Sequence, residues 1–224
     1  MLSCGICERR QFLKRVTMGS AAYFTIPGTF ADQLIQTPPQ GEGPFYPDIL
    51  PLDTDNDLIV INDEITPAVG EITHLTGKVT DLKGNPIRNA LVKIWQTDNN
   101  GIYIHSEGGS RDDLDTNFQG FGQFSTDLKG RYYFRCLKPV PYPGRPPHIH
   151  VAVERSGKRV LTTQVYVRGH ELNKKDFLLR RARDPQARDT LLVDFNPLKG
   201  SKAGELQAQF NIVLGVTPDE GRTS

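Results

Sequence analysis

The chain has 224 residues, of which 37% are hydrophobic and 24% are charged, and its formal net charge is +1. This length allows one sizeable hydrophobic core and is too short for two full domains. The even charge balance, without a basic run or an acidic tail, argues against a nucleic-acid partner. No stretch of 18 apolar residues is present that could span a membrane.

Residues 1–31 have the features of a signal peptide: a basic segment, a mildly apolar centre and a small residue, Ala31, at the expected cleavage point. The pair Arg9 and Arg10, followed by "QFLK", closely resembles the twin-arginine export signal, although Glu8 replaces the usual serine or threonine. This predicts export by the twin-arginine route to the periplasm or the exterior. The alternative is a basic amphipathic helix that covers the domain.

Cleavage after Ala31 would also determine how many cysteines the mature chain keeps. It would remove Cys4 and Cys7 and leave Cys136 alone in the mature chain. One cysteine forms no intramolecular disulfide, so the stability must come from the packed core.

The rest of the chain divides by its pattern into three segments. Residues 32–70 are rich in Pro, Gly and Asp, have no sustained period, and predict an extended N-terminal arm. Residues 71–217 show short alternating segments separated by turns, and residues 218–224 predict a flexible tail. The predicted fold class is mainly β, an antiparallel β-sandwich or barrel core with the arm and one or two short helices.

Within the β domain, alternation and turn residues predict the positions of individual elements. A helix is expected at residues 174–192, interrupted by Pro185, and a last strand at 205–215. The other strands are expected at 73–81, 89–97, 102–105, 122–127, 131–137, 148–154 and 159–167.

The strand "HIHVAVE" carries the first candidate functional residues. Because strand side chains alternate, His148 and His150 lie on one face and both imidazoles can reach one point. This pair is a plausible half of a metal site, although such histidines are also common on surfaces and in cores. None of the other three histidines has the spacing that would complete a zinc site.

Two sets of further ligands can complete the site. Glu154 follows on the same strand face, and His148, His150 and Glu154 resemble the first motif of cupin metalloenzymes. That motif has a glycine six positions before its first histidine, where this chain has Tyr142. The second set takes Tyr142, from the proline-rich loop before the strand, together with Tyr103. Two phenolates with two imidazoles favour a trivalent ion, which predicts Fe(III).

Four longer segments carry a specific resemblance: "GEGPFYP", "IWQTDNNGIY", "GQFSTDLKGRYYFRCLKPVPY" and "RPPHIH", in this order. Together they are similar to the intradiol ring-cleavage dioxygenases, most of all to the protocatechuate 3,4-dioxygenase branch. The similarity runs from about Thr37 to about Val216.

The resemblance implies a role for each matching residue. Tyr103 and His148 correspond to the equatorial iron ligands, Tyr142 and His150 to the axial ones, and Arg145 to the active-site arginine. Gln164 corresponds to a glutamine near the iron, and Tyr46 to a contact at the substrate mouth. Without the family, Arg145 would be read as a salt bridge that holds the proline loop.

The resemblance also implies a reaction. The expected cofactor is Fe(3+), and the expected partners are a small aromatic diol and O2, with a homo-oligomer left open. The ring of a catechol-type substrate would be cleaved to a cis,cis-muconate, with Tyr142 as ligand and base and Arg145 stabilising negative charge.

The chain departs from the family at two places that bear on the substrate. The long helical segment that precedes "GPFY" in catechol 1,2-dioxygenases has no counterpart here, and only Gly144 separates Pro143 from Arg145. A catechol, a substituted catechol and a hydroxyquinol therefore stay open as substrates. The cupin-type metal dioxygenase and a non-catalytic β-sandwich binding module stay as alternatives.

Overall fold

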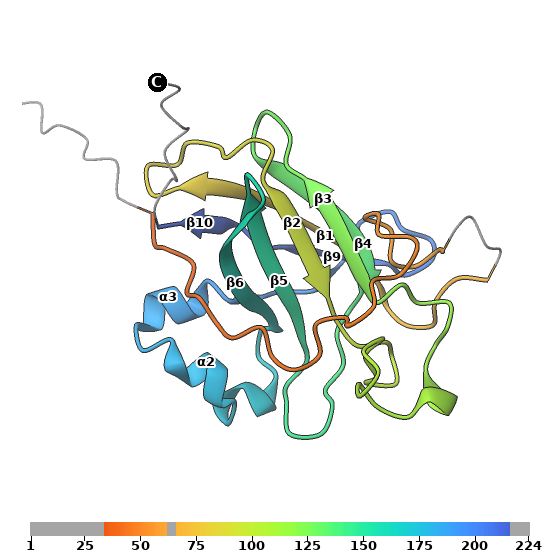
Figure 1. The fold of residues 1–224 in the computed structure, drawn as a ribbon. Coiled ribbons are helices and arrows are strands. Elements are labelled where there is room, and N and C mark those ends of the chain that lie inside the picture. Colours follow the sequence, from red (N-terminus) through yellow and green to blue (C-terminus); the bar gives the residue numbers. More distant parts are fainter. Residues whose placement is uncertain (1–33, 62–65, 216–224) are drawn as a thin grey trace, which may run out of the picture. The chain divides into compact units, whose positions relative to one another are not determined.

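The computed structural model describes residues 34–61 and 66–215, and two β-sheets that pack face to face dominate this part (Figure 1). The predicted signal peptide and the tail at residues 218–224 lie outside the described residues. The prediction of a mainly β fold is confirmed. No helix in the described part is long and apolar enough to cross a bilayer.

The first sheet is built around β1, the strand with the most neighbours. β1 pairs antiparallel with β4 on one side and parallel with β9 and β10 on the other, and β8 extends the sheet beyond β9. Its strands are β1 (Ile72–Asp81), β4 (Arg131–Leu137), β8 (Asn196–Pro197), β9 (Leu206–Gln209) and β10 (Ile212–Leu214).

The second sheet has the order β3-β2-β5-β6-β7 and is antiparallel except for its last pair. Its strands are β2 (Leu91–Trp95), β3 (Phe121–Ser125), β5 (His148–Arg155), β6 (Lys158–Val167) and β7 (Leu192–Val193). Four short helices lie in the described residues: the 3₁₀ turns η1 (Arg111–Asp113) and η2 (Glu171–Lys174), and the α-helices α2 (Phe177–Arg181) and α3 (Pro185–Asp189).

The first six residues of β5 are buried on both faces of the strand. One face joins the main core between the sheets, where Ile149 and Val151 lie in the same cluster as Leu75 of β1 and Phe134 of β4. The other face carries His148 and His150 outward. A second, smaller apolar cluster around Trp95, Tyr103, Phe121 and Ala152 covers this outer face. The histidines are therefore buried without belonging to the main core.

The N-terminal arm, residues 34–61, supplies part of that cover and contains no strand or helix beyond one isolated bridge. It begins beside β10, where Thr37 N–H donates to the Val213 carbonyl over 3.0 Å. It then follows β6, where Gln40 N–H donates to the Thr162 carbonyl over 2.8 Å. Figure 1 shows this path as the orange segment that passes from β10 across β6 and β5.

Two predicted elements differ in detail from the structure. The helix expected at 174–192 is divided into α2 and α3, and Pro185 opens α3, since proline lacks the N–H that a helix interior needs. The last strand is interrupted at Phe210 and Asn211, although β9 and β10 keep the same register against β1.

Gly77 explains this interruption. The Tyr132 hydroxyl donates to the Phe210 carbonyl over 2.6 Å, and Tyr132 lies opposite Gly77 in the ladder between β1 and β4. A Cβ on Gly77 would lie 1.9 Å from the Phe210 oxygen and 2.7 Å from the Tyr132 hydroxyl. The absent side chain thus makes room for a tyrosine to bond to the neighbouring strand.

We expect Gly77→Ala to lower the free energy of unfolding by at least about 2 kcal/mol, because the methyl group must displace backbone in a packed sheet. Gly41→Ala is the matched control: nothing lies within 4 Å of its Cβ position, and its cost should stay below about 0.5 kcal/mol. Urea unfolding followed by circular dichroism measures both. Equal losses in the two variants would contradict the close approach at Gly77.

Candidate metal centre

His148 and His150 come together at the start of β5, each 2% exposed. Their Nε2 atoms lie 3.1 Å apart. The Tyr103 hydroxyl lies 3.0 Å from Nε2 of His150 and 3.3 Å from Nε2 of His148. Three potential ligand atoms therefore surround one point.

The tautomer of His148 follows from its backbone contact. Its Nδ1 lies 2.7 Å from the Pro146 carbonyl, which can only accept, so Nδ1 carries the proton and Nε2 offers a lone pair. Burial lowers the pKa of His148 to about 3, and the positive charge of Arg145 is the next cause. Burial also lowers the pKa of His150 well below its ordinary value. Both imidazoles are uncharged at neutral pH, as metal ligands must be.

This donor set fits a metal ion. An ion with bonds of about 2.1 Å to ligands at right angles separates neighbouring ligand atoms by about 3.0 Å, close to the distances found here. Nδ1 of His150 is also buried and has no hydrogen-bond partner in the described part of the chain.

Tyr103 reaches the site from a loop, and the prediction of a strand at residues 102–105 is wrong. Tyr103 N–H donates to the Gly108 carbonyl over 3.1 Å, and Gly108 N–H donates back to the His105 carbonyl over 2.8 Å. The segment folds on itself instead of pairing with a neighbouring strand. Burial is the main cause that raises the pKa of Tyr103 well above its ordinary value, and the adjacent Tyr142 adds to it.

Tyr142 lies in the proline-rich turn before β5 and is half-buried. Its ring centroid lies 5.5 Å from those of Tyr103 and His148. The turn closes through Arg145 N–H, which donates to the Tyr142 carbonyl over 2.9 Å, with Gly144 at a positive φ of 82°. The structure thus brings all four predicted metal ligands to one place.

Glu154, the ligand of the cupin alternative, is engaged elsewhere. It forms ion pairs with Lys93 at 2.8 Å and with Arg159 at 3.2 Å. It follows His150 by four residues, about 13 Å along an extended strand. No group of three or more His, Cys, Asp or Glu side chains in the described residues could hold a metal ion. The geometry therefore does not support the cupin alternative.

Arg145 does form the salt bridge considered from its sequence position, and its partner was not predicted. Nε donates to Oδ2 of Asp176 over 2.8 Å, and the side chain of Asp176 is 0% exposed. Burial alone would lower the pKa of Arg145, but the hydrogen bond and the charge of Asp176 outweigh it and raise the pKa. A fixed positive charge therefore lies beside the histidines.

Gln164 lies opposite His150 in the ladder between β5 and β6. Its Oε1 accepts from Nη2 of Arg145 over 2.6 Å and from the Tyr166 hydroxyl over 3.0 Å. Its Nε2 donates to the Gly41 carbonyl in the arm over 3.2 Å. Gln164 thus connects the arginine, the strand and the arm.

Aromatic side chains enclose the site on the remaining sides. Trp95 stacks on the His150 ring at 4.8 Å with 9° between the planes, and Phe45 stacks on Tyr103 at 5.2 Å. Tyr46, the predicted substrate contact, packs edge-on against Trp95 at 5.0 Å. Of these two neighbouring arm residues, Phe45 is the one whose ring stacks on a candidate ligand.

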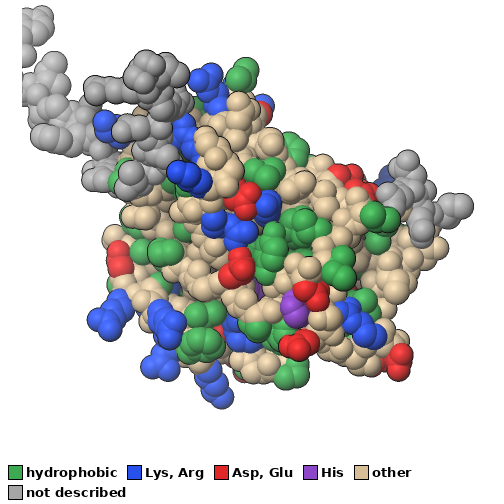
Figure 2. All heavy atoms as spheres, in the orientation of Figure 1, with side chains coloured by type: hydrophobic (Ala, Val, Ile, Leu, Met, Phe, Trp, Pro, Cys, Tyr) green, Lys and Arg blue, Asp and Glu red, His purple; other side chains and the backbone are tan. Residues whose placement is uncertain are grey.

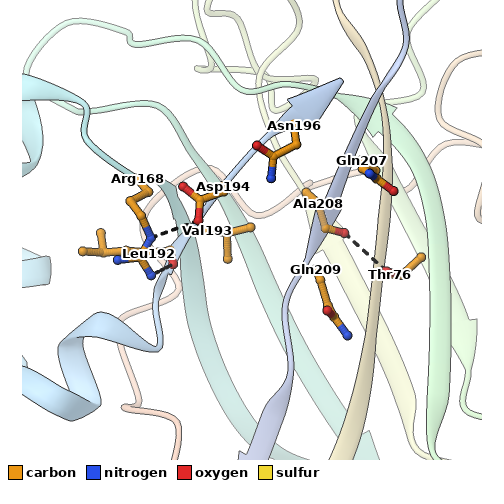
Figure 3. A pocket seen from close by; sticks show the side chains of 9 residues that line it. All are labelled: Thr76, Arg168, Leu192, Val193, Asp194, Asn196, Gln207, Ala208 and Gln209. Atoms are coloured by element: carbon orange, nitrogen blue, oxygen red, sulfur yellow. Dashed lines mark hydrogen bonds and ion pairs between the residues drawn. The ribbon is translucent and has the colours of Figure 1, made fainter. Parts of the chain in front are cut away.

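Two surface pockets differ in their relation to this site. A pocket of about 180 Å³ is lined by Gln40, Gly41, Leu178 and Arg181, next to the arginine network. Lys and Arg side chains gather over α2 and α3 on this side of the molecule (Figure 2). A larger pocket of about 550 Å³ lies over β7 and β9, and it contains none of the predicted ligands (Figure 3). Its one arginine, Arg168, is already paired with Asp189 and Asp194.

Comparisons with known proteins show which family the chain resembles. A family model described as Dioxygenase matches residues 41–146. The protocatechuate 3,4-dioxygenase beta chain of Burkholderia cepacia is 37% identical over 155 residues, which are 65% of this chain and 65% of that protein. A solved dioxygenase domain from Streptomyces sp. SirexAA-E, part of a fusion with a carbohydrate-binding protein, is 30% identical with a TM-score of 0.61. That alignment covers 81% of this chain and 99% of the domain. The chain belongs to the intradiol ring-cleavage dioxygenase family.

The curated relatives match over only part of their own length. The catechol 1,2-dioxygenase of Candida albicans is 35% identical over 108 residues, 40% of this chain and 34% of that protein. The match therefore spans between about a third and two thirds of these curated relatives. The 3-chlorocatechol 1,2-dioxygenase of Rhodococcus opacus 1CP, at 21% identity and a TM-score of 0.62, shares the fold.

We expect His150→Ala to remove most of the bound metal from the purified protein, because it deletes the imidazole that faces both other donor atoms. Glu154→Ala is the control: it removes a carboxylate on the same strand that pairs with Lys93 and Arg159, and the metal content should not change. Elemental analysis measures both variants. Loss of metal in Glu154→Ala with retention in His150→Ala would reverse the assignment.

Proposed function

We propose that this protein is a non-haem Fe(III) dioxygenase that uses O2 to cleave the ring of a catechol-type diol to a cis,cis-muconate. The observation that carries the proposal is the set of three donor atoms at 3.0–3.3 Å, two of them on uncharged imidazoles. Tyr142 adds a second phenol, and a set of two phenolates and two imidazoles suits a trivalent ion. Family membership supports both the reaction class and the metal.

Tyr103, Tyr142, His148 and His150 would hold the ferric ion, which would bind the diol and make its ring reactive toward O2. The roles of the protein groups follow from their surroundings. Tyr103 is 1% exposed and is held by its loop, so it stays in place when substrate enters. Tyr142 is half-buried in a turn whose Gly144 has open space around it. Tyr142 is therefore the ligand that is free to move, and its phenolate oxygen would take a proton from the diol and become a neutral phenol.

Arg145 provides the fixed positive charge. Its guanidinium, held by Asp176 and Gln164, is preorganised to stabilise negative charge on the substrate ring and its oxygen. Phe45 and Trp95 pack on Tyr103 and His150 and exclude water from the site, which strengthens that interaction. The diol can be catechol itself or a substituted catechol such as a protocatechuate-like diol.

The purified protein should be red-brown, from charge transfer between tyrosinate and Fe(III). Tyr142→Phe should bleach or shift that band and lower the turnover of the diol. The control is Tyr133→Phe on β4, whose hydroxyl bonds to His74 outside the site and should not affect the colour. A visible absorption spectrum and iron analysis measure both variants. A colourless protein with full metal occupancy would contradict the proposal.

The same preparation tests the reaction and the substrate. O2 uptake and product absorbance are followed with catechol, protocatechuate, hydroxyquinol and alkyl-substituted catechols. The diol with the highest kcat/KM names the substrate class. Iron-loaded protein that consumes O2 with none of them contradicts the proposed activity, and absence of stoichiometric metal favours a non-catalytic binding module.

We also propose that the chain is exported by the twin-arginine route, on the strength of Arg9, Arg10 and the residues that follow them. Replacing both arginines with lysine should keep the unprocessed precursor in the cytoplasm of a bacterial host that has this route. Cell fractionation and immunoblotting measure the distribution. Export of the double-lysine variant at the unaltered rate would contradict the proposal.

A further inference from the structure

The buried carboxylate of Asp176 makes two different contacts, one with each oxygen. Its Oδ2 accepts from Nε of Arg145 over 2.8 Å, and its Oδ1 accepts from Leu179 N–H over 2.7 Å at the start of α2. Asp176 is thus at once the N-cap of a short helix and the counter-ion of the site arginine.

Capping alone does not explain why this aspartate is buried. Asp184 caps α3 in the same way, with its carboxylate accepting from Gln186 N–H over 3.0 Å, and it remains exposed. Both helices have five residues. Burying a carboxylate costs solvation that a helix cap does not restore, whereas a guanidinium at 2.8 Å offsets it. The position of Asp176 is therefore explained by Arg145.

The second contact of the guanidinium fixes its plane. Nη2 donates to Oε1 of Gln164 over 2.6 Å, and Gln164 is paired with His150 across β5 and β6. Asp176 and Gln164 hold two edges of a planar group, so the plane is set relative to the histidine strand. Among the described residues, no group accepts a hydrogen bond from Nη1.

The Tyr166 hydroxyl lies between these groups. It lies 3.0 Å from Oε1 of Gln164, 3.4 Å from Oδ1 of Asp176 and 3.2 Å from Oε1 of Gln40 in the arm. All the partners of Arg145 are therefore held in turn by α2, β6 and the arm.

We propose that Asp176 is a positioning residue for the dioxygenase reaction: it orients Arg145 from the N-terminus of α2 without touching the substrate. This inference rests on the proposed function. It assigns to α2 a part in catalysis, because moving this short helix would move the carboxylate and with it the guanidinium.

The decisive variant is Asp176→Asn, which keeps an oxygen for the Leu179 cap and removes the charge facing Arg145. We expect kcat to fall about 10- to 100-fold, the range typical of a misplaced catalytic group, with KM changed much less. The iron content and the visible band should not change. Asp184→Asn, the matched cap on α3, should leave kcat, KM and the spectrum as they are.

A double-variant cycle separates positioning from general damage. In an Arg145→Gln background, Asp176→Asn should lower kcat by less than about twofold, because the group that it orients is gone. Asp176→Glu, which keeps the charge, should recover most of the loss and also serves as the second variant if Asp176→Asn does not fold. An equal loss of kcat in both backgrounds, or no loss in Asp176→Asn, would overturn the proposal.

A readout independent of activity keeps this test distinct from that of the proposed function. In full-length protein loaded with diamagnetic Ga(III), the Arg145 Nε–H resonance, assigned by its absence in Arg145→Lys, should shift in Asp176→Asn and not in Asp184→Asn. An unshifted resonance in Asp176→Asn overturns the positioning role even if the enzyme is active. Absence of O2 uptake in the unaltered protein overturns the proposed function instead.

Discussion

The structure depends on the burial of two uncharged imidazoles on the outer face of one strand. Water would compete for their lone pairs, so the face of β5 that carries His148 and His150 must be covered as completely as the face that joins the main core. The covering elements come from distant parts of the sequence: the arm, the Tyr103 loop and the proline-rich turn. Each of these elements helps to exclude water from the two imidazoles. The carbonyl of Pro146 also contributes, because it accepts from Nδ1 of His148 and so keeps the lone pair on Nε2.

The features that the sequence predicted are those that depend on residues close together in the chain. The alternation in "HIHVAVE" placed both histidines on one face, and the proline-rich turn placed Tyr142 and Arg145 next to them. The structure places Tyr103 beside these histidines, but on a loop and not on the strand that its sequence predicts. The alternation in "IYIH" is also compatible with a loop that closes on Gly108. The interruption at Phe210 depends on Gly77, more than 130 positions earlier, and no local pattern carries that information.

Asp176 shows the same limit at the site itself. Its neighbours in sequence, "KKDFLL", are those of an ordinary helix start, and nothing local marks it as the partner of an arginine 31 positions away. The choice between Phe45 and Tyr46 also depends on how the arm crosses β2 and β5, which side-chain type does not determine. The sequence could therefore name the candidate ligands that the structure brings together, whereas the groups that orient Arg145 required the tertiary structure.

The arm begins at the opposite end of its path from the candidate metal centre, and this matters for the proposed cleavage of the signal peptide. Leu34 N–H donates to the Leu82 carbonyl, and Thr37 is bound to Val213 through both backbone and hydroxyl, at the end of the molecule beside β10. These hydrogen bonds begin a few residues after the expected cleavage point at Ala31. They hold the start of the arm, which places Phe45 against Tyr103. The position of the processed N-terminus thus decides how many anchors remain. Removal of six residues after Ala31 would delete both Leu34 and Thr37. The arm segment that carries Phe45 and excludes water from the site would then lose these anchors.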